Sequence, residues 1–127
     1  MANRTVDQQE LNKLMRDGWS YVALVPKQFS NNDQLELRDN SEHFAVDDIA
    51  ELSIVLPDSM SPGFRCAIDF GCGDTATSMV YPDSIVWSGD NLDENMKFIP
   101  VHNHRYHIDV WHDGSIIRAN ASGVIIR

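Results

Sequence analysis

The segment from Tyr106 to Gly114 constrains the fold of this chain more than any other. Large apolar side chains alternate with other residues along it, so they share one side of an extended strand. The apolar side holds Tyr106, Ile108 and Val110, and the other side holds His107, Asp109 and Trp111. Asp113-Gly114 then predicts a two-residue hairpin turn, and Ile116 is expected to begin the return strand. This pattern is typical of an all-β protein.

Further strand-like segments occur along most of the chain, and residues that favour turns separate them. They are expected at residues 19–25, 35–37, 52–56, 64–70, 84–87, 116–121 and 124–126. Their number and spacing predict an antiparallel β-sandwich of about seven to nine strands in one domain, residues 19–127. The residues expected in its core are Ile54, Phe70, Trp87, Tyr106 and Ile108.

Residues 1–18 are expected to form an N-terminal arm with one short helix. Asp7 is a suitable N-cap, and an apolar stripe follows at helical spacing. A helix of about three turns is marginal in water, so its stripe must be covered. The next segment, 19–25, is apolar on both faces and is expected to end at Pro26. The arm and this strand therefore predict a partner-binding surface made of Leu11, Leu14, Met15, Trp19, Tyr21, Val22 and Leu24.

The charge balance bears on the kind of partner. Lys and Arg number 10 against 19 Asp and Glu, which gives a net charge of −9. Such a surface repels phosphates, so nucleic-acid binding is not expected. The sequence contains no apolar run near the ~20 residues that span a bilayer, so we expect a soluble protein made in the cytoplasm that binds no membrane.

Neither cysteine belongs to a recognisable catalytic or metal pattern. Cys66 shares one face of a strand-like segment with Phe64, Ile68 and Phe70, which predicts a buried thiol. A disulfide with Cys72 is the alternative in an oxidising compartment. A nucleophile, a base and oxyanion donors do not occur together in any motif, so the chain is not expected to be an enzyme.

Four of the five histidines lie close together in the sequence, and zinc would accept such ligands. They are His102, His104, His107 and His112. Exposed positions around a turn and on the polar side of a strand are the simpler explanation, and the set of ligands is incomplete. The acidic segment Asp90–Lys97 similarly lacks the glycine and terminal glutamate of a calcium loop. We therefore expect no metal and no cofactor, with metal binding as the alternative.

Several short motifs occur in an order that resembles a known module. The upstream motifs are Leu37-Arg38-Asp39-Asn40-Ser41-Glu42, Leu52-Ser53-Ile54, Pro57 and Phe70-Gly71. The downstream matches are Tyr81-Pro82, Trp87, Gly89, Pro100, Asn103, Tyr106 and Ile108. Together they resemble a small β-sandwich module of tail, fibre and head-surface proteins of tailed bacteriophages, gut phages especially. The resemblance covers roughly residues 35 to 124 and implies a virion or adhesion role without catalytic residues.

Two functions follow from these expectations. The first is a bacteriophage virion structural protein (capsid decoration, head fibre or tail accessory component) that binds other virion proteins and copies of itself. Its location would then be the virion, assembled in the host cytoplasm. The alternative is a carbohydrate- or receptor-binding adhesin, for which Trp111 is the candidate glycan contact because aromatic rings stack on sugars.

Overall fold

The computed structural model describes residues 24–126 of the chain. Every regular element in this range is a β-strand. The strands are β1 (Val25–Gln28), β2 (Gln34–Glu36), β3 (Ser41–Phe44), β4 (Glu51–Val55), β5 (Arg65–Gly71), β6 (Ser78–Val80), β7 (Ile85–Gly89), β8 (His104–His112) and β9 (Ile117–Ile125). The predicted all-β class is therefore confirmed. The helix expected within residues 1–18 lies outside the described residues.

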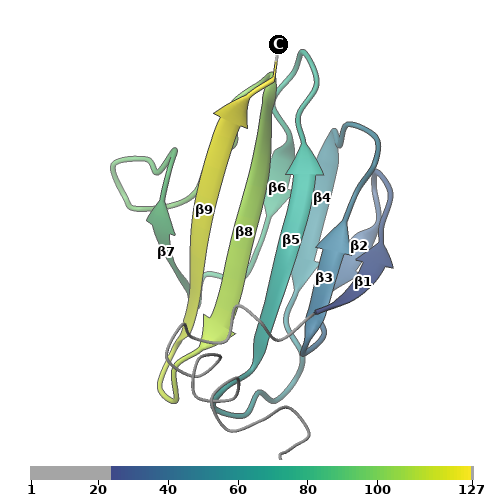
Figure 1. Cartoon of the computed structure of the whole chain (residues 1–127). Helices are drawn as coiled ribbons and strands as arrows, with labels where there is room; N and C mark the ends of the chain where they lie inside the picture. The colour runs from purple at the N-terminus through teal and green to yellow at the C-terminus, as the bar shows by residue number, and fades with distance from the viewer. Residues whose placement is uncertain (1–23, 127) are drawn as a thin grey trace, which may run out of the picture.

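The nine strands form two sheets, and consecutive strands from β1 to β7 alternate between them. The six-stranded sheet has the order β1-β3-β5-β8-β9-β7, and the three-stranded sheet has the order β2-β4-β6. Figure 1 shows the three-stranded sheet behind β3 and β5. The six-stranded sheet therefore has one face toward the smaller sheet and one face, here called the outer face, turned away from it.

Most neighbouring strands are parallel, which corrects the antiparallel arrangement expected from the sequence. Five of the seven strand pairings are parallel, whereas β8 is antiparallel to both β5 and β9. Parallel neighbours need a crossover connection. Here a strand of the opposite sheet makes that crossover, as β2 does between β1 and β3. Alternation along a strand is the same in either direction, so it could not reveal this winding.

The inward sides of both sheets meet in one hydrophobic core. The five residues expected there are all buried, with exposed fractions of 0 to 4%: Ile54, Phe70, Trp87, Tyr106 and Ile108. The Trp87 ring stacks on Phe98 with centroids 5.0 Å apart, and Phe98 meets the Tyr106 ring edge-on at 5.0 Å. The periodicity of the sequence therefore identified the core correctly.

The first strand differs from the prediction. Pro26 lies inside β1 instead of ending the strand before it, and all four β1 residues are exposed. Proline is tolerated there because β1 is an edge strand, which among the described residues pairs only with β3. Leu24 precedes β1 and is half-buried. The other predicted partner-binding residues lie outside the described residues: Leu11, Leu14, Met15, Trp19, Tyr21 and Val22.

The predicted hairpin joins β8 and β9, but its loop is longer than expected. His112 pairs with Ile117, so four residues, 113–116, form the connection instead of two. Gly114 has a φ of 99°, whereas Asp113 is not among the residues with positive φ. The Asp113 carboxylate instead accepts hydrogen bonds from the N–H groups of Ser115 and Ile116 at 2.8 and 2.9 Å. This bonding makes a wider turn, in which Asp113 does not need a positive φ.

Both cysteines are buried and form no disulfide with each other, and the burial of Cys66 is as expected. Burial raises the pKa of the Cys66 thiol to about 12, with smaller contributions from Asp39 and Asp109. The Cys72 sulfur lies 3.1 Å from the Thr77 hydroxyl oxygen. Between residues 24 and 126, no helix is both long and apolar enough to cross a membrane.

Candidate functional site

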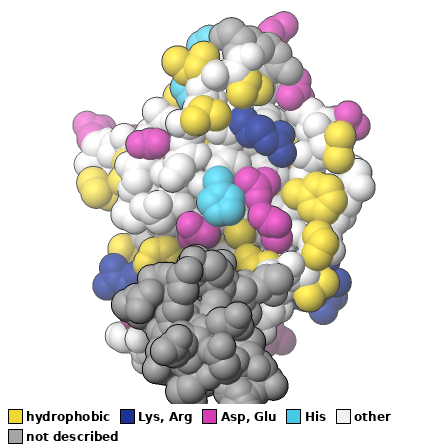
Figure 2. All heavy atoms as spheres, in the orientation of Figure 1, with side chains coloured by type: hydrophobic (Ala, Val, Ile, Leu, Met, Phe, Trp, Pro, Cys, Tyr) yellow, Lys and Arg dark blue, Asp and Glu magenta, His cyan; other side chains and the backbone are white. Residues whose placement is uncertain are grey.

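The outer face of the six-stranded sheet brings together ionisable side chains from three adjacent strands. Figure 2 shows a histidine surrounded by acidic side chains near the middle of this face. Asp69 on β5 lies directly opposite His107 on β8. Glu42 on β3 is paired with Ala67, which in turn is opposite Asp109. Glu42, Asp69, His107 and Asp109 are here called the His107 cluster.

Both ring nitrogens of His107 contact carboxylates. Nδ1 lies 3.0 Å from Oδ1 of Asp69, and Nε2 lies 3.0 Å from Oδ1 of Asp109. The side chain of His107 is 42% exposed, against 24% for Asp69 and 59% for Asp109. One ligand atom each from Glu42, Asp69 and His107 fits within 4.8 Å of the others. The cluster is therefore compact, and water can reach it.

The charges in the cluster shift the protonation of its members. Hydrogen bonds from Asp109 and then Asp69 raise the pKa of His107 to about 10, although burial opposes them. Both ring nitrogens then carry hydrogens and donate one to each carboxylate. Burial alone would raise the pKa of Asp69, but His107 outweighs it and the pKa is lowered. The pKa of Glu42 is raised, first by its hydrogen bond to Asp69 and then by burial.

This arrangement is a cationic imidazole held between carboxylates at neutral pH. The same groups are metal ligands when they lose their protons, because zinc accepts both imidazole nitrogen and carboxylate oxygen. Among residues 24–126, only Glu42, Asp69 and His107 bring three such ligand groups close to one another. The cluster is therefore the strongest candidate for a chemical site in the described part of the chain.

The four histidines that are close in sequence do not form one site. Nδ1 of His104 is 2.9 Å from the backbone oxygen of His102, and the His104 ring stacks on Tyr106. Nδ1 of His112 accepts a hydrogen bond from the N–H of Gly114 at 3.2 Å. Of the four, only His107 belongs to the cluster.

Sequence reasoning missed Glu42 and Asp69 as neighbours of His107. Asp69 alternates with the core residues Ile68 and Phe70, and that pattern places its side chain on the outer face. What the pattern lacks is the order of the strands, because Glu42 and Asp69 are far from His107 in the sequence. The sequence did show that two acidic residues occupy outward positions. Only the order of the strands in the sheet shows that they lie beside His107.

Trp111, the candidate glycan contact, also lies on the outer face. It is half-buried and stands opposite Arg65 on β5 and Arg118 on β9. Its face is therefore shared with Asp109 and His107, two and four residues earlier in β8. The ring is neither fully covered nor fully free.

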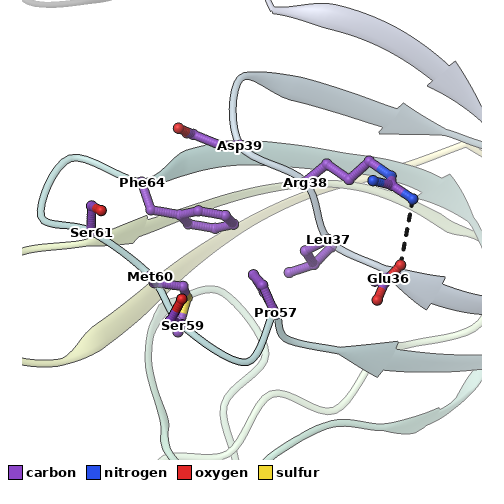
Figure 3. A pocket seen from close by; sticks show the side chains of 9 residues that line it. All are labelled: Glu36, Leu37, Arg38, Asp39, Pro57, Ser59, Met60, Ser61 and Phe64. Atoms are coloured by element: carbon purple, nitrogen blue, oxygen red, sulfur yellow. Dashed lines mark hydrogen bonds and ion pairs between the residues drawn. The ribbon is translucent and has the colours of Figure 1, made fainter.

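A separate hollow of about 360 Å³ lies between the end of β2 with the residues that follow it and the loop that follows β4. Its lining residues are Glu36, Leu37, Arg38, Asp39, Pro57, Ser59, Met60, Ser61 and Phe64. Figure 3 shows Phe64 pointing toward Leu37 and Pro57 across this space. Arg38 forms an ion pair with Glu36 at 3.5 Å, and their side chains are 62% and 61% exposed. An ion pair this exposed contributes little stability.

Comparisons of the chain with protein-family models, with curated proteins and with solved structures found no significant match.

Proposed function

We propose that this chain is a non-enzymatic structural protein of a bacteriophage virion, a capsid decoration, head-fibre or tail accessory component that acts by binding other proteins. Its motifs resemble those of a phage module, and its two sheets share one core, which supports a β-sandwich architecture of that kind. An acidic surface disfavours nonspecific binding to nucleic acid. The particle and its own copies are the partners, and the virion is the location.

The observation that carries this proposal is a group of exposed aliphatic side chains where β9 ends. Val124, Ile125 and Ile126 are 63%, 72% and 42% exposed. Val124 is paired with Arg105. The Arg105 guanidinium donates a hydrogen bond to the carbonyl of Ala45 at 3.1 Å, and the residue after Ala45, Val46, is 66% exposed. Figure 2 shows hydrophobic side chains beside a basic one at the upper end of the face. Exposed aliphatic side chains gathered at one end of a sheet favour protein binding there.

Val46, Val124, Ile125 and Ile126 are here called the β9-end patch. The N-terminal arm, residues 1–18, is proposed as a second docking element because its apolar stripe must be covered. A standard interface buries about 800 Å² per partner. Together, the arm and the patch would give a subunit two separate contacts in an assembly.

Sedimentation and particle-binding assays test this function. We expect deletion of residues 1–17 and, separately, Ile125→Asp to lower binding to phage particles or to alter the assembly state. Met96→Asp is the matched control, because Met96 is 60% exposed but lies in the loop after β7. If both changed proteins fold, keep the assembly state and join particles as well as the unchanged chain, the proposal is wrong.

A glycan-binding adhesin is the second candidate, and the half-buried Trp111 on the outer face favours it. A partly exposed tryptophan on a sheet face offers a surface on which a sugar ring can stack. Glycan-array binding that is lost on Trp111→Ala, while Val86→Ala on the same sheet retains it, would favour the adhesin. Array binding that is absent or insensitive to Trp111 would remove it.

A further inference from the structure

We propose that the His107 cluster is a binding site for one divalent transition-metal ion, with Zn²⁺ fitting it best. Glu42, Asp69 and His107 are the ligands, and Asp109 is a positioning residue that orients the imidazole. This inference differs from the expectation from sequence that the chain binds no metal. It does not depend on the proposed structural function.

The three ligands come from strands that are hydrogen-bonded neighbours, β3, β5 and β8. Asp69 and His107 face each other directly across the β5–β8 pairing. Glu42 is paired with Ala67, two residues before Asp69, and Ala67 places only a methyl group between Glu42 and Asp109. Ligands on paired strands are held more rigidly than ligands on loops, which favours a preformed site.

The distances fit a shared ion. Zinc binds imidazole nitrogen and carboxylate oxygen at about 2.0–2.2 Å, so two of its tetrahedral ligands lie roughly 3.4 Å apart, a spacing that a small side-chain shift from the present contact would give. Nδ1 of His107 and Oδ1 of Asp69 are 3.0 Å apart. The Glu42 carboxylate needs only a side-chain rotation to complete the set, since its oxygen is within 4.8 Å of the other two ligand atoms. Water fills the remaining positions because the cluster is partly exposed.

Asp109 supplies the outer partner that metal-binding histidines need. Its carboxylate lies 3.0 Å from Nε2 of His107. A hydrogen kept on Nε2 leaves the lone pair on Nδ1, the nitrogen that faces Asp69. Without metal both nitrogens carry hydrogens, so forming the Zn–Nδ1 bond releases the Nδ1 proton to water. Protons and the metal ion therefore compete for these groups, which makes binding weaker as the pH falls.

The test is a titration of Zn²⁺ alone into the chelator-treated full chain by isothermal calorimetry, with elemental analysis of the product. We expect one Zn²⁺ per chain, release of protons, and an affinity that falls as the pH is lowered from 7.5 to 6. His107→Gln and Asp69→Asn should abolish stoichiometric binding. Asp109→Asn should weaken it by about 10–100-fold, the usual effect of losing an outer partner. His102→Ala is the matched control and should bind as the unchanged chain does.

The outcomes separate clearly. Thermal unfolding without metal shows whether each variant folds, and if His107→Gln does not, the graded loss in Asp109→Asn carries the test. No stoichiometric Zn²⁺ at pH 7.5 would overturn the site. Binding that survives His107→Gln and Asp69→Asn, or that is lost on His102→Ala, would also overturn it, because the ligands would then lie elsewhere.

Discussion

His43 and His107 belong to the same six-stranded sheet, but their surroundings differ completely. His43 on β3 faces inward and is 3% exposed. Its Nε2 accepts a hydrogen bond from the backbone N–H of Arg38 at 3.2 Å, so the ring is neutral there. Burial, followed by the charges of Lys27 and Arg38, lowers its pKa. His107 faces outward between two carboxylates, and its pKa is raised to about 10.

The two faces of the sheet therefore have different roles. On the inner face burial dominates, and even a histidine is held neutral by its place in the core. On the outer face side chains from strands that are distant in sequence meet, and their charges dominate. The inner face therefore specifies the fold, and the outer face supplies the candidate chemistry.

Trp87 and Val86 are neighbours on β7 that point to opposite faces. Trp87 is 4% exposed and packs against Tyr81 and Phe98, with centroids 4.8 and 5.0 Å away. Trp87→Ala should lower the free energy of unfolding by about 3–5 kcal/mol, since it leaves a large cavity. Val86 is 46% exposed, so Val86→Ala should lower the free energy of unfolding by about 0.5 kcal/mol or less. Urea unfolding measures both, and equal losses would contradict the assigned faces.

Gly123 and Ser122 make a similar pair on β9. A Cβ atom at Gly123 would lie 2.5 Å from Cε1 of Tyr106, whose ring is buried. Gly123→Ala should therefore cost about 1–3 kcal/mol through overpacking. Ser122→Ala, at an exposed position, is the control and should be close to neutral. Thermal unfolding that ranks the two variants in the reverse order would show that Tyr106 does not pack as described.

The Tyr106 hydroxyl is the polar end of an otherwise apolar contact. It accepts a hydrogen bond from the N–H of Val101 at 2.8 Å and donates one to Oδ1 of Asn91 at 2.7 Å. Tyr106→Phe should lower the free energy of unfolding by about 1 kcal/mol, the net value of a typical hydrogen bond. In a double-mutant cycle with Asn91→Ala, the double variant should lose less stability than the sum of the losses in the two single variants. Strict additivity would mean that the hydroxyl and the amide do not interact.

A smaller effect is a pH dependence of stability at the His107 cluster. The pKa of His107 in the folded chain is raised above the unfolded value of about 6.5. Its contribution is therefore fully present below pH 6.5 and is lost as the pH rises toward 10. The side chain is partly exposed, so solvent screening keeps the contribution small. In metal-free buffer, Asp109→Asn should reduce the loss of stability between pH 6.5 and 10, and an unchanged pH profile would argue against the contact.

The opposite sign is expected at His43. Its pKa in the folded chain is lowered, so the unfolded chain binds the proton more readily below pH 6.5. Its contribution to stability is present above pH 6.5 and is lost as the pH falls. His43→Gln should make unfolding less sensitive to acid than it is in the unchanged chain, and denaturant titrations at pH 7 and pH 5 measure the difference. An equal acid sensitivity would place His43 outside the core.

The sequence predicted the inner face well and the outer face poorly. Alternation identified Tyr106 and Ile108 as core residues and located most of the strands, because burial leaves a local pattern. It did not reveal the parallel winding, since a strand in the opposite sheet can make a connection that looks like a turn. Glu42 and Asp69 meet His107 only through that winding. The expected N-terminal helix lies outside the described residues and stays a prediction.

The most direct test of the two-face account is an NMR titration of the histidine side chains in the metal-free chain. Nitrogen chemical shifts report the protonation of each ring, and His43→Gln and His107→Gln assign the two signals. The account predicts that His43 titrates below 6.5 and that His107 stays protonated well above it, near pH 10. If both rings titrate together near pH 6.5, the inner and outer faces do not differ as described, and the account is contradicted.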